Sequence, residues 1–509
     1  MSGKASKHIV VCPIHLWGHA RPLSILVARL IILSAVKVTY FIAAKLLDAA
    51  KAEIVRDLGQ EQHDATLAAR IRFVPIEQGE DPFDTRMYQE NVNATWDDLL
   101  SGRTITAHSL DGRQCDIDLR GAPLTAVIMD LFSVQSFTAI HKSRETSLTP
   151  FKIYVWVAVA TDCVLSLFRE DRIAQAEASA ALHGTSIDEE AHKLMWAPSG
   201  RVVQSQCLPA MYDYEFYPQG LQVPPAFSGR IFIRIPRVLQ EADGAITFDA
   251  AAYHPEATAA FQDWFAETSR RVFYVGPLVA AARSPVQTDE GTGSVREFLD
   301  EQLATYGERA VIYISFGSLF WPMDIDKIEA VLDVLMERDF SFVLTRPSPF
   351  YTLSEEMKHR LHQYRRAFIA DWVPQRAVLD HPATGWCLTH GGHNTVLECV
   401  LAGVPMILWP IVMDQATNAV YLTHKLNVAY ELLEVRHGTG LGTVYRTGKK
   451  PSGTVDAVKA ELHGVLDQVF GPDGEDKRTR LRKLSCTLQE AWEAEGPSRQ
   501  ACEGFLDDI

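Results

Sequence analysis

The sequence predicts an α/β protein with two Rossmann-like, doubly wound domains, and three observations support this prediction. Continuous apolar runs, typical of buried parallel strands, alternate with segments of helical periodicity. The same alternation starts again in the second half of the chain, after a stretch rich in Ser, Pro, Thr and Gly. The length of 509 residues is enough for two or three domains, each with its own core.

The first domain is expected over residues 1–280. Its strands, loop and helix follow one another as HIVVCPI (8–14), the loop HLWGHARP (15–22), the helical LSILVARLIIL (23–33), VKVTYFIA (36–43), TAVIMDLF (125–132) and RVFYVGPL (271–278). A linker is expected over 281–294, because Ser, Pro, Thr and Gly are concentrated there.

The second domain is expected over residues 295–485. Its elements are AVIYISFGS (310–318), the helical DIDKIEAVLDVLMERD (324–339), SFVLTR (341–346), AFIADW (367–372), GWCLTH (385–390) and PMILWP (405–410). Residues 486–509 are expected to form a C-terminal helix that packs back on the first domain. Because ligands of such sheets bind at the carboxyl ends of strands, two facing domains imply a central cleft.

Composition excludes several classes of function. A formal net charge of −15 argues against nucleic acid as a partner, because there is no basic surplus to neutralise phosphates. Eight scattered cysteines without a CxxC pair, and the absence of a signal-peptide pattern, favour a cytoplasmic protein. The apolar stretches are too short or too charged to span a bilayer, although peripheral membrane contact stays open. Nothing in the sequence indicates an oligomeric state.

A polar, glycine-containing segment, THGGHNTVLE (389–398), stands where a buried strand should turn into a helix. The strand places His390 at its end, and Gly391 and Gly392 allow a ligand to approach the backbone. Asn394 and Thr395 open the following helix, whose free N–H groups and dipole attract an anion. This arrangement favours a phosphate or a diphosphate as the ligand.

The wider segment WVPQRAVLDHPATGWCLTHGGHNTVLECVLAGVPMILWPIVMDQ (372–415) closely resembles the nucleotide-sugar signature box of the family 1 glycosyltransferases. W-x-P-Q, H-x-G-x-N-[ST]-x-x-E, A-G-V-P and the closing D-Q all occur at that family's spacing. YVGPL, YISFGS and EGPSRQACEGFL are similar to further landmarks of the family, so the resemblance extends over both domains. It implies the two-domain GT-B fold and a UDP-sugar as donor.

The resemblance also implies roles for single residues. Trp372 would stack on the uracil, and Glu398 would accept both ribose hydroxyls. The remaining donor-site residues implied are Val373 and Gln375 beside the uracil, Ser318, His390, Gly392, His393, Asn394 and Thr395 around the diphosphate and helix start, and Asp414 and Gln415 on the sugar hydroxyls.

The sequence specifies the identity of the donor sugar less clearly than the UDP part of the donor. Plant members of the family usually carry Trp where this chain has His393, and Gly391 replaces a common Cys. The closing Gln415 often accompanies glucose in the family, so UDP-glucose is the expected donor.

The loop after the first strand contains two histidines, His15 and His19, that could take a proton from an attacking hydroxyl. The resemblance selects His19, in the G-H-x-x-P pattern of GHARP, as general base and Asp130 as its partner. It implies one direct displacement that inverts the anomeric centre of a hexose and gives a β-glycoside. No metal and no prosthetic group are expected, and the box 372–415 contains no D-x-D motif.

The acceptor is expected to bind segments near 79–120 and 150–230. Their aromatic residues suggest a small lipophilic acceptor, although each could equally be core: Phe83, Tyr88, Trp96, Trp156, Trp196, Tyr212 and Phe216.

The sequence also allows four other interpretations. Cys387, His390 and His393 have a spacing that zinc can use, but strand alternation and the glycine turn would scatter their side chains. A nicotinamide-dependent oxidoreductase would need G-x-G-x-x-G after a strand, which the first loop lacks. A sugar-nucleotide epimerase and a non-catalytic UDP-sugar-binding protein on the same scaffold remain as alternatives.

Overall fold

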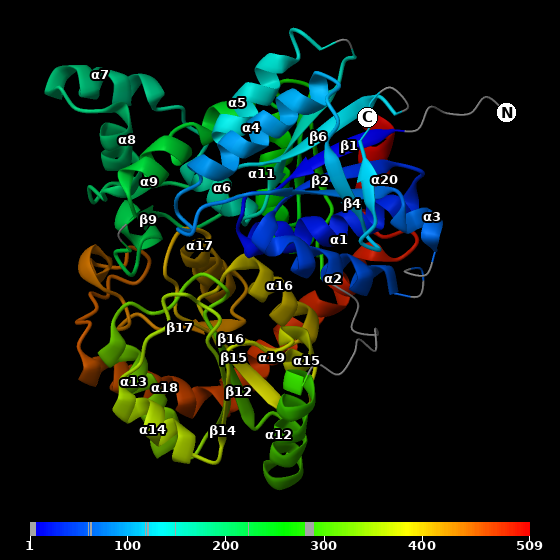
Figure 1. Ribbon diagram of the computed structural model, residues 1–509. Helices are drawn as coiled ribbons and strands as arrows, with labels where there is room; N and C mark the ends of the chain where they lie inside the picture. The colour runs from blue at the N-terminus through cyan, green and yellow to red at the C-terminus, as the bar shows by residue number, and fades with distance from the viewer. Residues whose placement is uncertain are drawn as a thin grey trace. The chain divides into compact units, whose positions relative to one another are not determined.

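The computed structural model describes residues 7–59, 61, 64–117, 119, 122–147, 149–221, 223–279 and 290–509. The chain divides into two compact units (Figure 1). The first unit comprises Met1–Ala197, Val223–Ser284 and Ala491–Ile509, and the second comprises Pro198–Gln222 and Pro285–Glu490. Most of the expected linker, residues 281–289, lies outside the described residues.

The first unit is built around a nine-stranded sheet of order β11-β10-β7-β6-β1-β2-β3-β4-β5. All neighbours from β11 to β3 are parallel, and β4 and β5 continue the sheet antiparallel. The strands are β1 His8–Cys12, β2 Lys37–Ala43, β3 Ile71–Ile76, β4 Thr106–Ser109, β5 Gln114–Asp116, β6 Leu124–Asp130, β7 Lys152–Val157, β10 Gly244–Thr247 and β11 Arg271–Tyr274. The strand order reverses between β1 and β6, and ligands of open α/β sheets bind at such a switch point.

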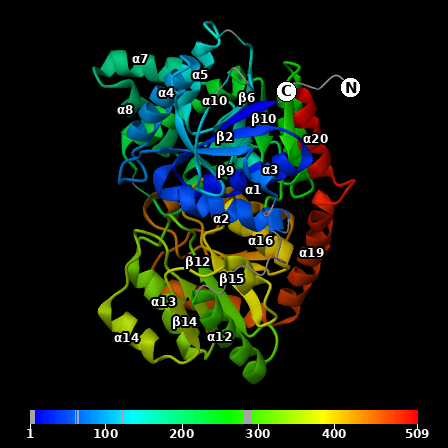
Figure 2. The same ribbon diagram turned by 45° about the vertical axis from the view of Figure 1, so that its right-hand side comes forward.

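Helices cover this sheet and close its β11 edge. They are α1 Trp17–Leu33, α2 Leu47–Leu58, α3 Ala65–Ala68, α4 Arg86–Leu100, α5 Val134–Ser143, α6 Thr161–Leu167, α7 Ile173–His183, α8 Ile187–Trp196, α9 Pro225–Phe232, α10 Ile235–Glu241, α11 Pro255–Ala266 and α20 Pro497–Asp508. The last of them, α20, packs beside β11 (Figure 2). Its Phe505 ring lies edge-on to Tyr154, with ring centroids 5.0 Å apart, and 5.8 Å from the centroid of Phe273.

The second unit contains a six-stranded, fully parallel sheet of order β14-β13-β12-β15-β16-β17. The strands are β12 Val311–Ser315, β13 Ser341–Thr345, β14 Ala367–Ala370, β15 Thr384–Thr389, β16 Met406–Leu408 and β17 Ala429–Glu431. The helices are α12 Glu290–Tyr306, α13 Ile325–Glu337, α14 Glu355–Gln363, α15 Gln375–Leu379, α16 His393–Ala402, α17 Asp414–Val420, α18 Val455–Val469 and α19 Pro472–Gln489. Here the order reverses between β12 and β15, which is the switch point of this sheet.

Residues 198–221, which we call the strap, belong to the second unit although the chain on both sides belongs to the first. The strap contains a two-stranded hairpin, β8 Val202–Val203 with β9 Met211–Tyr212, and the short helix η3 Asp213–Phe216. Helices α8 and α9, which flank it, pack against each other in the first unit. No sequence pattern indicated that this segment would pack with the second sheet.

The parallel strands confirm the predicted α/β class. One local expectation was wrong: HLWGHARP is not a loop, because α1 already begins at Trp17 and contains Pro22. Proline fits helical φ and removes only one N–H donor. The nearby carbonyl of Ala20 accepts hydrogen bonds from Ser24 Oγ at 2.8 Å and Tyr40 Oη at 3.1 Å. Among the described residues, none of the helices combines the length and the apolar character needed to cross a membrane.

Candidate active site

The switch point of the first sheet brings His19 and Asp130 together. His19 is the third residue of α1, directly after β1, and Asp130 is the last residue of the neighbouring strand β6. His19 Nδ1 lies 2.9 Å from Asp130 Oδ2, and the carboxylate is completely buried. Asp130 Oδ1 accepts the backbone N–H of Phe132 at 2.9 Å, which fixes the carboxylate. Because a carboxylate accepts only, Nδ1 carries the proton and Nε2 is the basic nitrogen.

Two aromatic side chains lie next to His19. The Phe132 ring lies 5.0 Å from it, and the Trp156 indole donates to the backbone carbonyl of His19 at 3.2 Å. Phe132 in turn contacts Phe232 at 5.6 Å between centroids. Phe232 is the centre of a buried cluster with Phe168, Trp196 and Phe227.

Sequence reasoning named Trp196 from this cluster and missed Phe132 and Phe232. Of the other aromatics named for the acceptor, Tyr88, Trp96 and Trp156 are core residues with at most 1% exposure. Tyr212 and Phe216 lie in the strap, within the second unit. Phe132 had a signal that was overlooked, since it follows the strand-end Asp130 by two residues.

His390 occupies the switch point of the second sheet, directly after β15. Two glycines leave room for its ring. A Cβ on Gly317, where φ is +74°, would lie 2.9 Å from ring atoms of His390, and a Cβ on Gly392 would lie 2.4 Å from Nε2. Gly392 thus makes room for a side chain of the site itself, whereas the sequence suggested space for a ligand. Burial lowers the pKa of His390 to about 4, so the ring is neutral near pH 7.

The helix that follows, α16, starts at His393 with Gly392 as its N-cap. Its first turn has no acidic residue, and its N-cap, Gly392, has no side chain that could cap it. The first N–H groups of a helix have no partner within it and carry the positive end of its dipole. His393 Nδ1 lies 3.3 Å from Asn418 Oδ1, and Asn418 Nδ2 donates to the Gly391 carbonyl at 2.9 Å. This helix start is therefore rigidly held and suited to an anion.

Glu398 of α16 and Gln375 of α15 form a polar network. Glu398 is 1% exposed and accepts a hydrogen bond from Gln375 Nε2, which also approaches Thr395 Oγ1 at 3.3 Å. Gln375 Oε1 accepts from the Tyr313 hydroxyl at 3.2 Å. The arrangement orients the Glu398 carboxylate from a neighbouring helix, α15. A positioned carboxylate is suited to accept hydrogen bonds from a diol.

Three residues named from the sequence differ in exposure. Trp372 is 54% exposed and Ser318 is exposed, whereas Val373 is buried at 3%. An exposed tryptophan beside a polar site can provide a flat surface for a base. Val373, by contrast, packs in the interior.

Asp414 and Gln415 begin α17, after β16. Gln415 Oε1 accepts the backbone N–H groups of Ile411 at 2.9 Å and Val412 at 3.2 Å, so this side chain braces its own loop. Met413 precedes them at φ +53°, a backbone conformation that is uncommon for residues other than glycine. Like the other residues named for the donor, Asp414 and Gln415 belong to the second unit. All twelve of these residues thus lie in that unit, around one end of its sheet and the adjoining helices.

Among the residues that the structure describes, no group of three or more His, Cys, Asp and Glu side chains could hold a metal ion. Cys387 is buried inside β15, and His393 bonds to Asn418. The spacing C-x₂-H-x₂-H therefore does not form a ligand cluster.

Comparison with known proteins matches residues 286–438 to the family of UDP-glucoronosyl and UDP-glucosyl transferases. The UDP-glycosyltransferase eriJ of Hericium erinaceus is 28% identical over 99% of this chain and 98% of its own length. The chain is therefore similar to UDP-glycosyltransferases, through a family model in its second half and through a relative along its whole length. A flavonol 3-O-glucosyltransferase from Arabidopsis thaliana is 30% identical to this chain, over 47% of the chain and 48% of the plant protein.

Solved UDP-glycosyltransferase structures cover the chain from end to end. A Medicago truncatula enzyme complexed with UDP-glucose has a TM-score of 0.68 and 16% identity, and covers 99% of this chain and 98% of its own. A Phytolacca americana enzyme complexed with UDP-2-fluoro-glucose and pterostilbene has a TM-score of 0.64 and 19% identity, covering 99% of both chains. At this identity the likeness shows the fold, and it confirms the predicted GT-B class.

Proposed function

We propose that this UDP-glycosyltransferase transfers glucose from UDP-glucose to a hydroxyl of a small lipophilic acceptor, with inversion to a β-glycoside. The observation that carries the proposal is the buried His19–Asp130 pair at the switch point of a Rossmann-like sheet. An imidazole whose Nδ1 faces a carboxylate is suited to act as a general base.

In the proposed reaction, Nε2 of His19 takes the proton of the acceptor hydroxyl. The acceptor oxygen forms a bond to the anomeric carbon while the bond from that carbon to the diphosphate oxygen breaks. UDP leaves with the electron pair of that bond. Asp130 keeps Nδ1 protonated and stabilises the imidazolium that forms, because its charge lies 2.9 Å away.

We assign the donor to the second unit. Trp372 stacks on the uracil with Val373 and Gln375 beside it, and Glu398 binds the ribose diol. The diphosphate is bound by the start of α16 together with the groups Ser318, His390, Gly392, His393, Asn394 and Thr395. Asp414 and Gln415 bind the sugar hydroxyls. The support is the uncapped helix start and the oriented Glu398 carboxylate.

The acceptor is proposed to lie against the aromatic residues next to His19. Phe132 lies next to the base, and the buried aromatic cluster around Phe232 continues from it in the same unit. The Phytolacca americana relative was solved with pterostilbene and the Polygonum tinctorium relative with 3,4-dichloroaniline, both small aromatic compounds. A phenol or another small lipophilic alcohol is therefore the proposed acceptor class.

We further propose that transfer needs no metal ion. The N-terminal end of α16 supplies backbone N–H donors and a positive dipole for the charge that develops on the departing diphosphate. Full activity in the presence of excess EDTA is the expected result. The cytoplasmic location expected from the sequence stays a prediction.

The deciding experiment measures UDP release from several UDP-sugars, with and without a mixed pool of phenolic, terpenoid and sterol acceptors. Mass spectrometry identifies the products. The expected result is acceptor-dependent UDP release, greatest with UDP-glucose, together with a hexose-mass adduct of β configuration. An interconverted UDP-sugar in the absence of acceptor would instead support an epimerase, and an α-linked product would contradict the inverting mechanism.

A further inference from the structure

The strap, residues 198–221, contacts the loop that carries the proposed sugar-binding residues. The Met413 backbone N–H donates to the Phe216 carbonyl of the strap at 2.7 Å. Met413 is the N-cap of α17, and Asp414 and Gln415 are the first two residues of that helix. Helix η3 of the strap also packs against α17. The strap thus bonds directly to the residue that sets the start of the sugar-binding helix.

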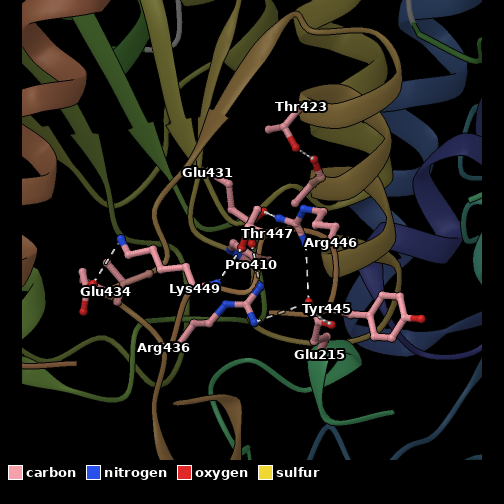
Figure 3. Close-up of polar contacts among 12 residues, drawn as sticks. Glu215, Pro410, Thr423, Glu431, Glu434, Arg436, Tyr445, Arg446, Thr447 and Lys449 are labelled. Carbon is pink, nitrogen blue, oxygen red and sulfur yellow. Dashed lines mark hydrogen bonds and ion pairs between the residues drawn. The ribbon is translucent and has the colours of Figure 1, made fainter. Parts of the chain in front are cut away.

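A buried set of charges fastens the strap at this place (Figure 3). The Glu215 side chain is completely buried, and its Oε1 accepts the backbone N–H of Tyr445 at 2.9 Å. Its Oε2 pairs with Arg446 Nη1 at 3.4 Å and with Arg436 Nη1 at 3.9 Å. Both arginines also pair with Glu431, so two carboxylates balance two guanidinium groups. Loss of one member would leave a buried charge without its counter-charge.

The closeness of the strap also depends on two glycines in the segment after β17. A Cβ on Gly440 would lie 2.1 Å from the Pro218 carbonyl oxygen, and a Cβ on Gly442 would lie 2.6 Å from the Tyr214 ring. Tyr214 Oη donates to the Thr443 carbonyl at 2.7 Å. A side chain at Gly440 would displace the strap, because its neighbours are backbone atoms of Pro218 that cannot give way cheaply, and one at Gly442 would displace the Tyr214 ring.

The loop before α17 is held from both sides. Gln415 Oε1 braces Ile411 and Val412 from within, as described above. From the strap, Gln219 Nε2 donates to the Val435 carbonyl at 3.0 Å and reaches the Pro410 carbonyl at 3.4 Å. Met413 lies in the chain between Pro410 and Gln415 and adopts φ +53° and ψ −116°. This uncommon backbone conformation persists only if the surrounding contacts hold it. The Phe216 carbonyl supplies one of these supports.

We propose that the strap is a positioning element for the donor sugar. Glu215 and Gly440 hold the Phe216 carbonyl against Met413, and the strap thereby sets the direction in which Asp414 and Gln415 present their polar groups. The inference rests on the proposed role of these two residues in binding the sugar. It predicts that the strap affects recognition of the sugar and leaves recognition of UDP unchanged, because Trp372 and Glu398 lie on other elements of the unit.

The test compares Glu215→Gln and Gly440→Ala with two controls. Val202→Thr changes a half-exposed residue of the strap hairpin, and Gly464→Ala adds a methyl to a helical glycine with nothing within 4 Å. The readouts are UDP affinity by calorimetry, kcat/KM for UDP-glucose and UDP-galactose with one phenolic acceptor, and hydrogen exchange of the Met413 amide.

We expect both strap variants to bind UDP as the unmodified protein does. Their kcat/KM for UDP-glucose should fall about 10²-fold, because small misplacements of binding groups have effects of that size. The preference for UDP-glucose over UDP-galactose should shrink, and the Met413 amide should exchange faster. Unchanged sugar preference in both variants would overturn the inference, as would equal loss of UDP affinity and sugar preference.

A measurement on the unmodified protein covers the case in which a variant does not fold. Without acceptor, UDP-glucose should slow hydrogen exchange in the strap segment 212–219 more than UDP does. Identical exchange with the two ligands would contradict the proposal. Asp414→Asn tests the assignment of the sugar site separately from the role of the strap. If this variant keeps the preference for UDP-glucose over UDP-galactose, the assignment of the sugar site is wrong and the inference falls with it.

Discussion

His19 Nδ1 and Asp130 Oδ2 are 2.9 Å apart although 111 residues separate them in the chain. The contact exists because β1 and β6 are neighbours in the sheet while α1 begins directly after β1. His19 therefore stands in a helical first turn and points its Nδ1 at the end of the next strand. A rigid helix and a rigid strand fix this geometry.

The first prediction concerns this pair. Asp130→Asn should lower kcat by about 10³–10⁴-fold, because an amide can bind the wrong tautomer of His19. His19→Ala should abolish transfer and leave UDP affinity nearly unchanged. The double variant His19→Ala/Asp130→Asn should bind UDP as well as His19→Ala does, and any residual turnover of His19→Ala should not fall further in it, since the two residues act as a unit. Turnover measured under saturating donor checks this, and additive losses would contradict a common function.

The second prediction concerns Trp372, which is 54% exposed. Trp372→Ala should raise the Kd for UDP about 10- to 100-fold, because stacking of a base on an aromatic ring contributes about 1–3 kcal/mol. The melting temperature should change little, since few neighbours lose contacts. Calorimetric titration with UDP measures the affinity, and Trp372→Phe should retain part of it. An unaltered affinity in the alanine variant would rule out stacking on this residue.

The third prediction concerns Gly392 and His390. The backbone of Gly392 has φ −61°, which alanine adopts without strain, so the effect of Gly392→Ala comes only from contact with the ring. The new Cβ would displace His390 and should weaken UDP binding by more than about tenfold, about 1.4 kcal/mol. Gly464→Ala is the matched control, because its methyl meets nothing and should be neutral or slightly stabilising. Equal behaviour of the two variants would remove His390 from the diphosphate site.

The fourth prediction concerns the pH dependence of stability. Burial lowers the pKa of His390 from 6.5 to about 4, so the unfolded state binds a proton at this residue between these values and the folded state does not. The free energy of unfolding must then fall as the pH drops from about 6.5 to 4. His390→Gln should reduce that fall by an amount on the order of 3 kcal/mol. Urea unfolding at several pH values tests it. Burial also lowers the pKa of His8 to about 4. His8 therefore adds a second fall of the unfolding free energy over the same pH range, and this fall persists in the His390→Gln variant.

Much of the fold was predictable because parallel strands have a strong local signal. Apolar runs such as 8–12 and 311–315 are buried on both faces, and they appear in the sequence as continuous hydrophobic segments. The start of α1 was harder to predict, because Pro22 suggested a loop, whereas a proline within a helix costs only one N–H donor and some strain.

The site was partly predictable for a different reason. All the residues proposed for the donor except Ser318 lie in one segment, 372–415, whose motif spacing can be recognised in the sequence without knowledge of the fold. The reason for Gly392 was not predictable, since the space that it leaves is filled by the ring of His390 two residues earlier. The strap was not predictable either, because its partners Tyr445 and Arg446 lie more than 200 residues from Glu215, and no local pattern marks such a pairing.

The position of α20 in the chain has a consequence for the order in which the two units can complete their folding during synthesis. Its Phe505 packs on β7 and β11 of the first unit, and Lys152 Nζ bonds to Asp508 Oδ2 at 2.8 Å. The ribosome makes these residues after it has made the whole second sheet. The first unit thus emerges early but lacks the cover of one sheet edge until translation has passed α20, so its final closure follows the synthesis of the second sheet.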